Sequence, residues 1–141
     1  VTDEADLPGI VVFDAEPLVA LYGDEPGSDT VAARIRAVES GDERGAINTV
    51  TCTEIHYVVS RHDSARAREY LTRIRNWLQV VRAESVWQDA ATFKAQYGVP
   101  LGDAFTLATA RHREGTALVG ADGDFDDVTE VEVERFRDGP A

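Results

Sequence analysis

The sequence contains a single cysteine, no methionine and no long apolar run among its 141 residues. With only Cys52 present, an internal disulfide is excluded. A transmembrane helix needs about 18 consecutive apolar residues, and no stretch of the sequence approaches that length. The acidic opening VTDEADLPG differs from signal and transit peptides, which are rich in basic residues. We therefore expect a cytoplasmic protein that makes no membrane contact.

Basic residues are also few. Fourteen Lys and Arg stand against 26 Asp and Glu, for a formal net charge of −12, and Lys94 is the only lysine. An acidic surface that is poor in lysine keeps a protein soluble where salt screens its self-repulsion, so we interpret it as a sign of a halophilic cytoplasm. The alternative is an acidic protein of an ordinary cytoplasm. The charge argues against nucleic-acid binding by overall composition and leaves local arginine clusters or bridging metal ions as the means of contact.

Short apolar runs alternate with helical patterns along the chain. Bounded, β-branched runs predict four strands and a short fifth, at 9–13, 45–50, 79–83, 116–120 and 131–136. Amphipathic patterns and cap signals predict helices within 14–23, 28–41, 51–62, 64–78, 85–98 and 99–115. Strands separated by helices predict an α/β fold with a mostly parallel sheet of four or five strands. We expect a single domain at 10–137, after a flexible N-terminal lead-in at 1–9.

Two of these helices carry specific predicted ends. Ser28 is the expected N-cap of the helix that stops at Gly41. Ser85 and Gln88 have the spacing of a capping box, and the helix that they open closes on Gly98. These signals set the expected boundaries of the helix before the second strand and of the helix after the third.

Acidic residues occur where the predicted strands end. Asp14 follows the first strand, Glu54 begins the helix after the second, and Asp103 opens the helix before the fourth. Asp122 and Asp124 follow the fourth strand in GADGDFDD, so all five carboxylates could gather at one edge of a parallel sheet. A hard divalent cation relieves the repulsion of clustered carboxylates, and oxygen ligands without His or Cys suit Mg²⁺ or Mn²⁺. Such ions clamp phosphate and activate water, so the pattern indicates phosphodiester hydrolysis.

Each acid also has a purely structural interpretation. Asp14 and Asp103 could be helix N-caps. Glu54 stands three residues after Thr51, which is the spacing of a capping box. The ADGDFDD segment could be a solvated acidic turn. Capping and metal binding are compatible, because a helix N-terminus holds a carboxylate in place, and the shared edge favours a site.

The order and context of these acids resemble those of PIN-domain ribonucleases, in particular the VapC toxins of type II toxin–antitoxin pairs. The resemblance rests on IVVFDAEPLVALYGDEPGSDTV, INTVTCTEIHYVVSRH and VPLGDAFTLATARHREGTALVGADGDFDDV, which lie within residues 10–128. LGDAFTLATA followed by a strand and DGDF is the most specific part. The resemblance implies a PIN-like three-layer α/β/α fold with helices on both sides of the sheet.

The resemblance also implies a function. The acidic quartet of the family carries over as Asp14, Glu54, Asp103 and Asp122, with Asp124 as a fifth member. Family members bind Mg²⁺ or Mn²⁺, cleave RNA, often form homodimers, and are inhibited by a small antitoxin whose tail enters the acidic cleft. We therefore expect an RNA substrate, a cognate antitoxin, a homodimer and one or two metal ions, with Glu54 bound to metal directly or through water.

Two positions depart from the family pattern. Glu16 lies two residues after the first Asp, where Ser or Thr is common, and Gly120 lies two residues before the fourth acid, where Thr or Ser is common. The first departure adds a carboxylate near the expected metal, and the second removes a hydroxyl ligand. Neither removes a member of the quartet.

Other chemically capable residues are assigned to structure or surface. The histidines lack metal-ligand spacing: His56, His62 and His112. Cys52 has no partner base in view and is expected to be small and buried. Trp77 and Trp87 are expected in the core or an interface, with RNA stacking as the alternative. A basic stripe on the helix at 64–78 is either a solvated face or a contact for RNA phosphates: Arg66, Arg68, Arg73 and Arg75.

Two rival functions stay open. A haloacid-dehalogenase-like phosphotransferase also places acids after its first and fourth strands, but it requires Asp-x-Asp and a catalytic lysine. This chain has DAE at the first position, and its only lysine lies in an amphipathic helix. The second rival is a non-catalytic PIN-like module that binds RNA or a protein. The complete quartet argues against it, because a binding module needs no set of four acids.

Overall fold

The computed structural model describes residues 8–138. They form a five-stranded sheet with strand order β3-β2-β1-β4-β5, in which every pairing is parallel. The elements are β1 (Ile10–Phe13), α1 (Ala15–Tyr22), α2 (Ser28–Ser40), β2 (Arg44–Asn48), α3 (Thr49–Ser60), α4 (Ser64–Trp77), β3 (Gln79–Val81), α5 (Trp87–Tyr97), α6 (Leu101–His112), β4 (Thr116–Val119) and β5 (Glu132–Arg135), with short 3₁₀ turns η2 (Ala83–Ser85) and η3 (Gly123–Phe125). The fifth strand is confirmed, and the sheet is wholly rather than mostly parallel.

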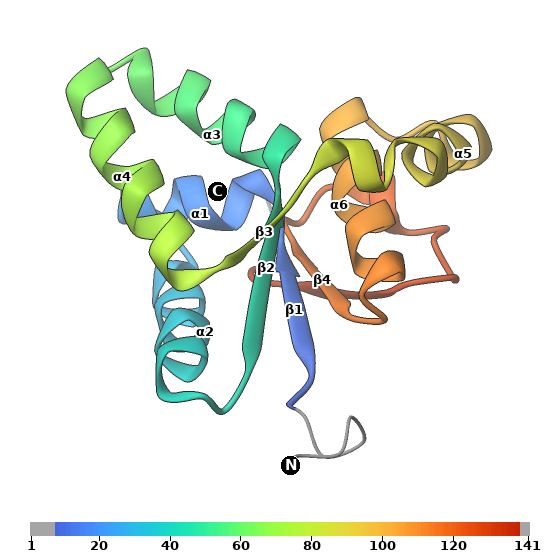
Figure 1. The fold of residues 1–141 in the computed structure, drawn as a ribbon, viewed down its shortest axis with the longest axis horizontal. Helices are drawn as coiled ribbons and strands as arrows, with labels where there is room; N and C mark the ends of the chain where they lie inside the picture. The colour runs from blue at the N-terminus through green and yellow to red at the C-terminus, as the bar shows by residue number, and fades with distance from the viewer. Residues whose placement is uncertain (1–7, 139–141) are drawn as a thin grey trace.

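Helices cover both faces of the sheet (Figure 1). The central strand β1 shows why: Val11 and Phe13 pack in one apolar cluster with α1 to α4, while Ile10 and Val12 pack in another with α5 and α6. Alternate residues of a strand point to opposite faces, so a strand that is apolar throughout needs cover on both sides. The predicted three-layer α/β/α fold is therefore confirmed.

Some predicted helix ends are wrong. Ser28 is the first residue of α2 rather than its cap, and its hydroxyl donates to Asp24 Oδ1 at 3.2 Å. Ser85 lies in the turn η2, and α5 begins at Trp87 without a side-chain cap, so the capping box is absent. These residues make other local contacts, which compete with capping. The predicted stop at Gly98 is confirmed, since this residue has φ 68° at the end of α5.

The second strand is shorter than predicted. β2 ends at Asn48, whose side chain accepts a hydrogen bond from the Val50 N–H at 2.8 Å and so caps α3. The β-branched pair Thr49–Val50 therefore begins a helix, because this cap outweighs its preference for a strand. The change moves Glu54 into the second turn of α3, where its side chain faces the end of β1.

The strand order places the end of β1 at a topological switch point. The chain moves from β1 to β2 and β3 on one side of the sheet and returns to β4 and β5 on the other. The connections leave a crevice beyond the carboxyl ends of β1 and β4, which is where ligands bind in such sheets. Within residues 8–138, no helix has both the length and the apolar character that crossing a bilayer requires.

The predicted lead-in at 1–9 lies outside the described residues except for its last two. The Pro8 carbonyl accepts a hydrogen bond from Arg44 Nε at 2.8 Å, and the Gly9 carbonyl accepts one from the Arg44 N–H at 3.0 Å. These two residues are thus attached to the start of β2 and continue the pairing of the sheet.

Candidate active site

A cleft of about 450 Å³ opens beyond the carboxyl ends of β1 and β4. Its walls come from α1, α3, the start of α6, the turn after β4 and the segment after β5. We call it the acidic cleft after the charged residues that line it: Asp14, Glu16, Glu25, Glu54, Asp103, Asp122 and Arg137. The four acids of the predicted quartet thus line one hollow, as the sequence predicted.

Asp14 lies at the floor of the acidic cleft. Only 5% of it is exposed. It occupies the N-cap position of α1, but its side chain makes no capping hydrogen bond. The carboxylate therefore does not act as the helix cap that was the alternative prediction. Instead Oδ1 accepts a 2.8 Å hydrogen bond from the buried hydroxyl of Thr106 on α6. The Thr51 hydroxyl of α3 lies 3.5 Å behind Thr106, so contacts from two helices fix the Asp14 side chain.

Asp103 faces Asp14 from the first turn of α6. The cap position of that helix belongs to Pro100, so Asp103 is not an N-cap. Burial raises the pKa of Asp103 to about 8, helped by the charge of Asp14, by a hydrogen bond with Asp14 and by the charges of Glu54 and Asp124. Burial likewise raises the pKa of Asp14. Without a cation the Asp14–Asp103 pair therefore holds a proton near neutral pH.

Glu54 completes this wall of the cleft. It makes no capping box with Thr51, because Asn48 caps α3. Its Oε1 is buried and has no hydrogen-bond partner among the described residues. Burial, and then the charge of Asp14, raise the pKa of Glu54. Its carboxylate packs directly against Gly102 of α6, where any side chain would overlap it.

The two acids after β4 are held differently. Asp122 and Asp124 are both exposed. Asp122 lines the cleft, but its Oδ1 accepts a 3.0 Å hydrogen bond from the Asp124 N–H and so caps the turn η3. Asp124 does not line the cleft, although its charge contributes to the raised pKa of Asp103. The structural role predicted for this turn is therefore present alongside its place at the site.

The two departures from the family pattern meet in space. The Glu16 carboxylate occupies the volume that a side chain at Gly120 would fill. The added acid and the missing side chain are thus neighbours in space. A carboxylate from α1 stands where the common pattern places a side chain after β4.

The residues present suit a hard divalent cation in their chemistry. The donors are all carboxylate oxygens, and the orphaned Glu54 Oε1 is a buried acceptor that an ion or its water would satisfy. Within residues 8–138, no three Asp, Glu, His or Cys side chains converge as ligands around one point. The cleft therefore has the right ligand type, and binding an ion would require its carboxylates to draw together.

The other candidates lie outside the acidic cleft. The histidines are exposed, as predicted: His56, His62 and His112. Cys52 is half-buried, and burial raises the pKa of its thiol, which disfavours a nucleophile. Trp87 is 55% exposed and so lies outside the core, which leaves an interface or RNA stacking as its prediction, while Trp77 is half-buried.

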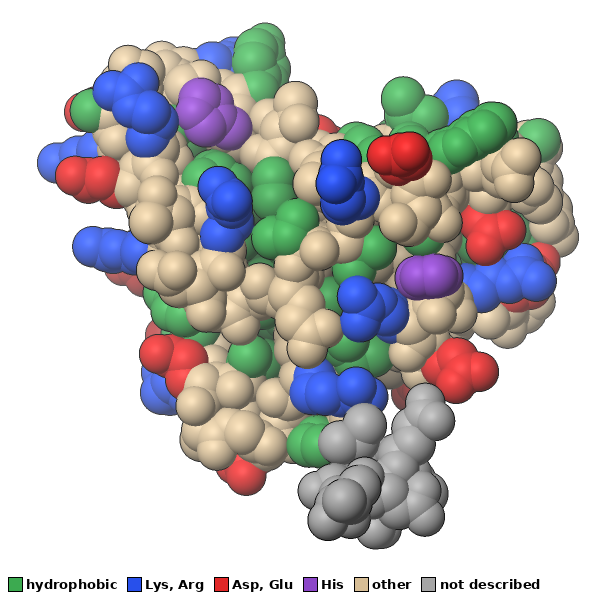
Figure 2. Space-filling view, viewed as in Figure 1, with side chains coloured by type: hydrophobic (Ala, Val, Ile, Leu, Met, Phe, Trp, Pro, Cys, Tyr) green, Lys and Arg blue, Asp and Glu red, His purple; other side chains and the backbone are tan. Residues whose placement is uncertain are grey.

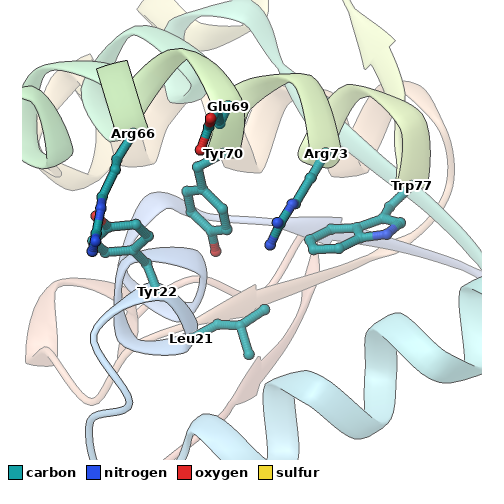
Figure 3. A pocket seen from close by; sticks show the side chains of 7 residues that line it. All are labelled: Leu21, Tyr22, Arg66, Glu69, Tyr70, Arg73 and Trp77. Carbon is teal, nitrogen blue, oxygen red and sulfur yellow. The ribbon is translucent and has the colours of Figure 1, made fainter. Parts of the chain in front are cut away.

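The predicted basic stripe of α4 divides between two sides of the helix. Arg66 and Arg73 line a hollow of about 540 Å³ between α1 and α4, together with Trp77 (Figure 3). We call it the α1–α4 groove. Arg75 instead lines a hollow beside Cys52. Figure 2 shows Lys and Arg side chains down the middle of the face presented in Figure 1, with Asp and Glu mostly toward its rim, so basic groups spread over several elements.

Three residues that contribute to the cleft were not predicted from the sequence: Gly102, Thr106 and Arg137. Thr106 holds Asp14, and its signal was the spacing of three residues after Asp103, which puts both on one face of α6. Gly102 gives room to Glu54. Arg137 had no local signal, because only the path of the chain after β5 brings it to the cleft.

Comparison with known proteins agrees with this geometry. Residues 11–131 match the family described as PIN domain. DNA-bound VapBC from Salmonella typhimurium superposes with a TM-score of 0.72, at 14% identity over 93% of this chain and 99% of that one. VapBC2 from Rickettsia felis, bound to a promoter DNA fragment, gives 0.69, at 15% identity over 89% and 98%. A toxin–antitoxin complex from Klebsiella pneumoniae gives 0.62, at 21% identity over 86% and 98%. No curated protein matches the sequence at a significant level.

Proposed function

Because this chain belongs to the PIN domain family, we propose that it is a metal-dependent ribonuclease of the VapC toxin type, which hydrolyses RNA phosphodiester bonds. One observation carries the proposal. Three carboxylates from β1, α3 and α6 are held together under partial or full burial, and the pKa of each is raised: Asp14, Glu54 and Asp103. Such an arrangement destabilises a chain unless a ligand uses it, and perturbed groups of this kind gather at functional sites.

The expected ligands of Mg²⁺ or Mn²⁺ are Asp14, Asp103 and Asp122, with Glu54 direct or through water and Asp124 at the margin. A bound ion would supply positive charge to the phosphate and a more acidic water. Thr106 keeps Asp14 oriented through its hydroxyl. Asp103 must release its proton before it can bind a cation, so ion binding is expected to weaken as the pH falls below about 8.

The partners follow from the same comparisons. The similar solved structures are toxin–antitoxin complexes, which supports a cognate antitoxin as the inhibitor of this chain. A homodimer, a cytoplasmic location and a halophilic source complete the proposal. The net charge of −12 supports the last of these.

The direct test is RNA cleavage by the purified protein in high salt, with Mg²⁺, with Mn²⁺ and with chelator, beside an Asp103→Asn variant. Asp89→Asn is the matched control, since Asp89 is an exposed acid on α5. We expect cutting that depends on the metal, survives in the control and is lost in Asp103→Asn. Cutting that persists in chelator, or in Asp103→Asn, would contradict the assignment.

A non-catalytic PIN-like module that binds RNA or a protein is the second candidate. The observation in its favour is that the carboxylates among the described residues do not already converge as metal ligands do. Metal binding measured by calorimetry, together with no cutting of structured or unstructured RNA, would select this candidate.

A further inference from the structure

A single basic side chain enters the acidic cleft. Among the described residues that line the cleft, Arg137 alone carries positive charge, against six acids. It follows β5, and the neighbouring Phe136 anchors it, being buried and donating its N–H to the Val119 carbonyl of β4 at 3.0 Å. Gly27, with φ +88°, lies so close that a Cβ there would come within 2.8 Å of the Phe136 ring. The backbone at Arg137 is therefore fixed beside the end of β4.

The Arg137 side chain is buried, yet its bonding is incomplete. Its side chain is only 10% exposed. Nη1 donates to the Pro26 carbonyl at 3.0 Å, whereas the contacts with Glu16 and Glu25 are long, at 3.4 Å and 3.5 Å. Its Nε is buried and has no partner among the described residues. A buried guanidinium group normally uses its donors, so one without a partner indicates a ligand.

A neighbouring arginine shows the contrast. Arg135 donates to the carbonyls of Gly120 and Asp122 at 2.9 Å and 2.6 Å, and to Asp126 Oδ1 at 2.6 Å. Those short bonds hold the turn after β4, and Arg135 does not line the cleft. The two arginines of this segment therefore differ: the protein itself uses Arg135 in short bonds, whereas Arg137 makes two long contacts and leaves Nε without a partner in the part of the chain that the structure describes.

The contact between the Glu16 carboxylate and Gly120 explains how Arg137 is positioned. Because Gly120 has no side chain, the Glu16 carboxylate reaches the end of β4 and meets Nη2 of Arg137. Glu25 approaches Nη1 from the other side. The two acids accept hydrogen bonds from the guanidinium group at the cleft, and both bonds are long.

We propose that Arg137 is a phosphate-binding residue of the acidic cleft, positioned by Glu16 and Glu25. The inference rests on the proposed function, in that the phosphate belongs to an RNA backbone. A cleft with six acids repels a phosphodiester, and a planar guanidinium group binds phosphate oxygens through paired N–H donors. Nε, which has no partner within residues 8–138, and Nη2 would form such a pair once a phosphate displaced the long Glu16 contact and reached Nε. The residue gives the substrate a cationic contact beside the carboxylates.

The test is binding of a fluorescein-labelled single-stranded RNA of mixed sequence, measured by anisotropy over a series of KCl concentrations. Ca²⁺ replaces Mg²⁺ so that carboxylates are occupied during binding. We compare the unchanged chain with Arg137→Met, which keeps the length of the side chain, and with Arg137→Gln. Arg111→Gln is the matched control, because Arg111 also pairs with a glutamate, at 3.1 Å, but at the far end of α6. Thermal unfolding of each variant reports its folding.

We expect either Arg137 variant to bind RNA about tenfold more weakly, because a hydrogen bond to a charged group is lost. The slope of log affinity against log salt should fall by about 0.7, the change for one phosphate contact with a single strand. The control should change neither quantity. A purely structural role would not move the slope.

A folded Arg137 variant with unchanged affinity and salt slope would overturn the inference while the proposed function stands, provided that the unchanged chain still binds and cuts RNA. Unfolding of both variants would assign Arg137 to stability and would overturn it as well. An unchanged chain that neither binds nor cuts any RNA would overturn the proposed function itself, and this inference with it.

Discussion

The acidic cleft and the α1–α4 groove are hollows of similar size, about 450 Å³ and about 540 Å³. They differ in how far their charged side chains are exposed to solvent. In the groove, Arg66, Glu69 and Arg73 are exposed and reach into water from one face of α4 (Figure 3). In the cleft, Asp14 is buried and Asp103 half-buried, and like charges face each other. Charged side chains line both hollows, but only in the cleft are several of them shielded from water: Asp14, Glu54 and Asp103.

The difference shows which hollow stores electrostatic free energy. Exposed charges of mixed sign are solvated and screened, so removing one changes little. Buried carboxylates of one sign raise each other's pKa and gain stability when a cation arrives. The predictions below test this contrast, beginning with the largest effect.

Asp14→Asn should reduce RNA cleavage about a thousandfold, because it removes the most buried carboxylate of the cleft from charge stabilisation. The fold should stay intact, since an amide oxygen still accepts the Thr106 hydrogen bond. Single-turnover cleavage and circular dichroism check the two parts. An active Asp14→Asn protein would remove the cleft from the mechanism.

Gly102→Ala should lower cleavage by about a hundredfold while leaving the chain at least as stable. The added methyl group would overlap the Glu54 carboxylate and displace it, and small displacements at a site carry losses of this size. Alanine in a helix is more favourable than glycine by about 0.5–1 kcal/mol, which offsets the strain. Cleavage and thermal unfolding are measured together.

Gly9→Ala provides the control for this change, since a methyl group there meets no atom within 4 Å. It should leave cleavage unaltered. If Gly102→Ala keeps full activity, the packing of Glu54 against α6 has no part in the reaction.

The stability of the metal-free protein should fall as the pH rises. The pKa of Asp103 is raised to about 8 in the folded chain, so the folded state binds its proton more tightly than the unfolded state does. This contribution is fully present below the ordinary carboxyl pKa near 4 and is lost as the pH rises through about 8. Unfolding temperatures in chelator, between about pH 5 and pH 9, should decline by roughly 5 °C.

Asp103→Asn should flatten this decline, because the variant has no proton to release at that position. Saturating Mg²⁺ should flatten it too, since the ion replaces the proton. A metal-free chain whose stability is constant over the range would show that the two carboxyls do not interact as described.

The combined substitution Arg66→Gln with Arg73→Gln should change cleavage less than twofold at high salt, the smallest effect of the series. Both groups are exposed in the α1–α4 groove, where salt weakens contacts with phosphate. Cleavage rates at low and high salt measure the effect. A large loss at high salt would make the groove a substrate site and would erase the contrast with the cleft.

Much of this molecule could be predicted from its sequence because two of its patterns are local. Apolar runs separated by helical periods predict a parallel sheet, and the acids after those runs predict the edge at which a site would form. The sequence accordingly predicts that Asp14, Glu54 and Asp103 lie together, and all three line the acidic cleft. The family-level resemblance added the three-layer architecture, which the structure confirms.

The other features depend on competition between alternative hydrogen bonds and on contacts between residues far apart in the sequence. Local sequence patterns contain neither kind of information. Ser28 and Ser85 fit the rules for helix caps, but neighbouring groups offered their backbone other bonds. Arg137 reaches the cleft only because β5 pairs with β4 and Phe136 is anchored there. Gly102 and Gly120 each leave room for a carboxylate from another helix, and only the three-dimensional structure shows which carboxylate fills that space.

The order of the strands also bears on when this protein becomes active during its synthesis. β1 is made early and lies at the centre of the sheet, but its partner on one side is β4, whose Thr116 and Ala117 pair with Val11 and Val12. A growing chain that already displays Asp14 lacks the opposite wall until more than 100 further residues have been added. Translation proceeds from the N-terminus, so the proposed nuclease cannot assemble its cleft on a partly made chain. The carboxylates of the cleft can therefore converge only after almost the whole of this sequence has been translated.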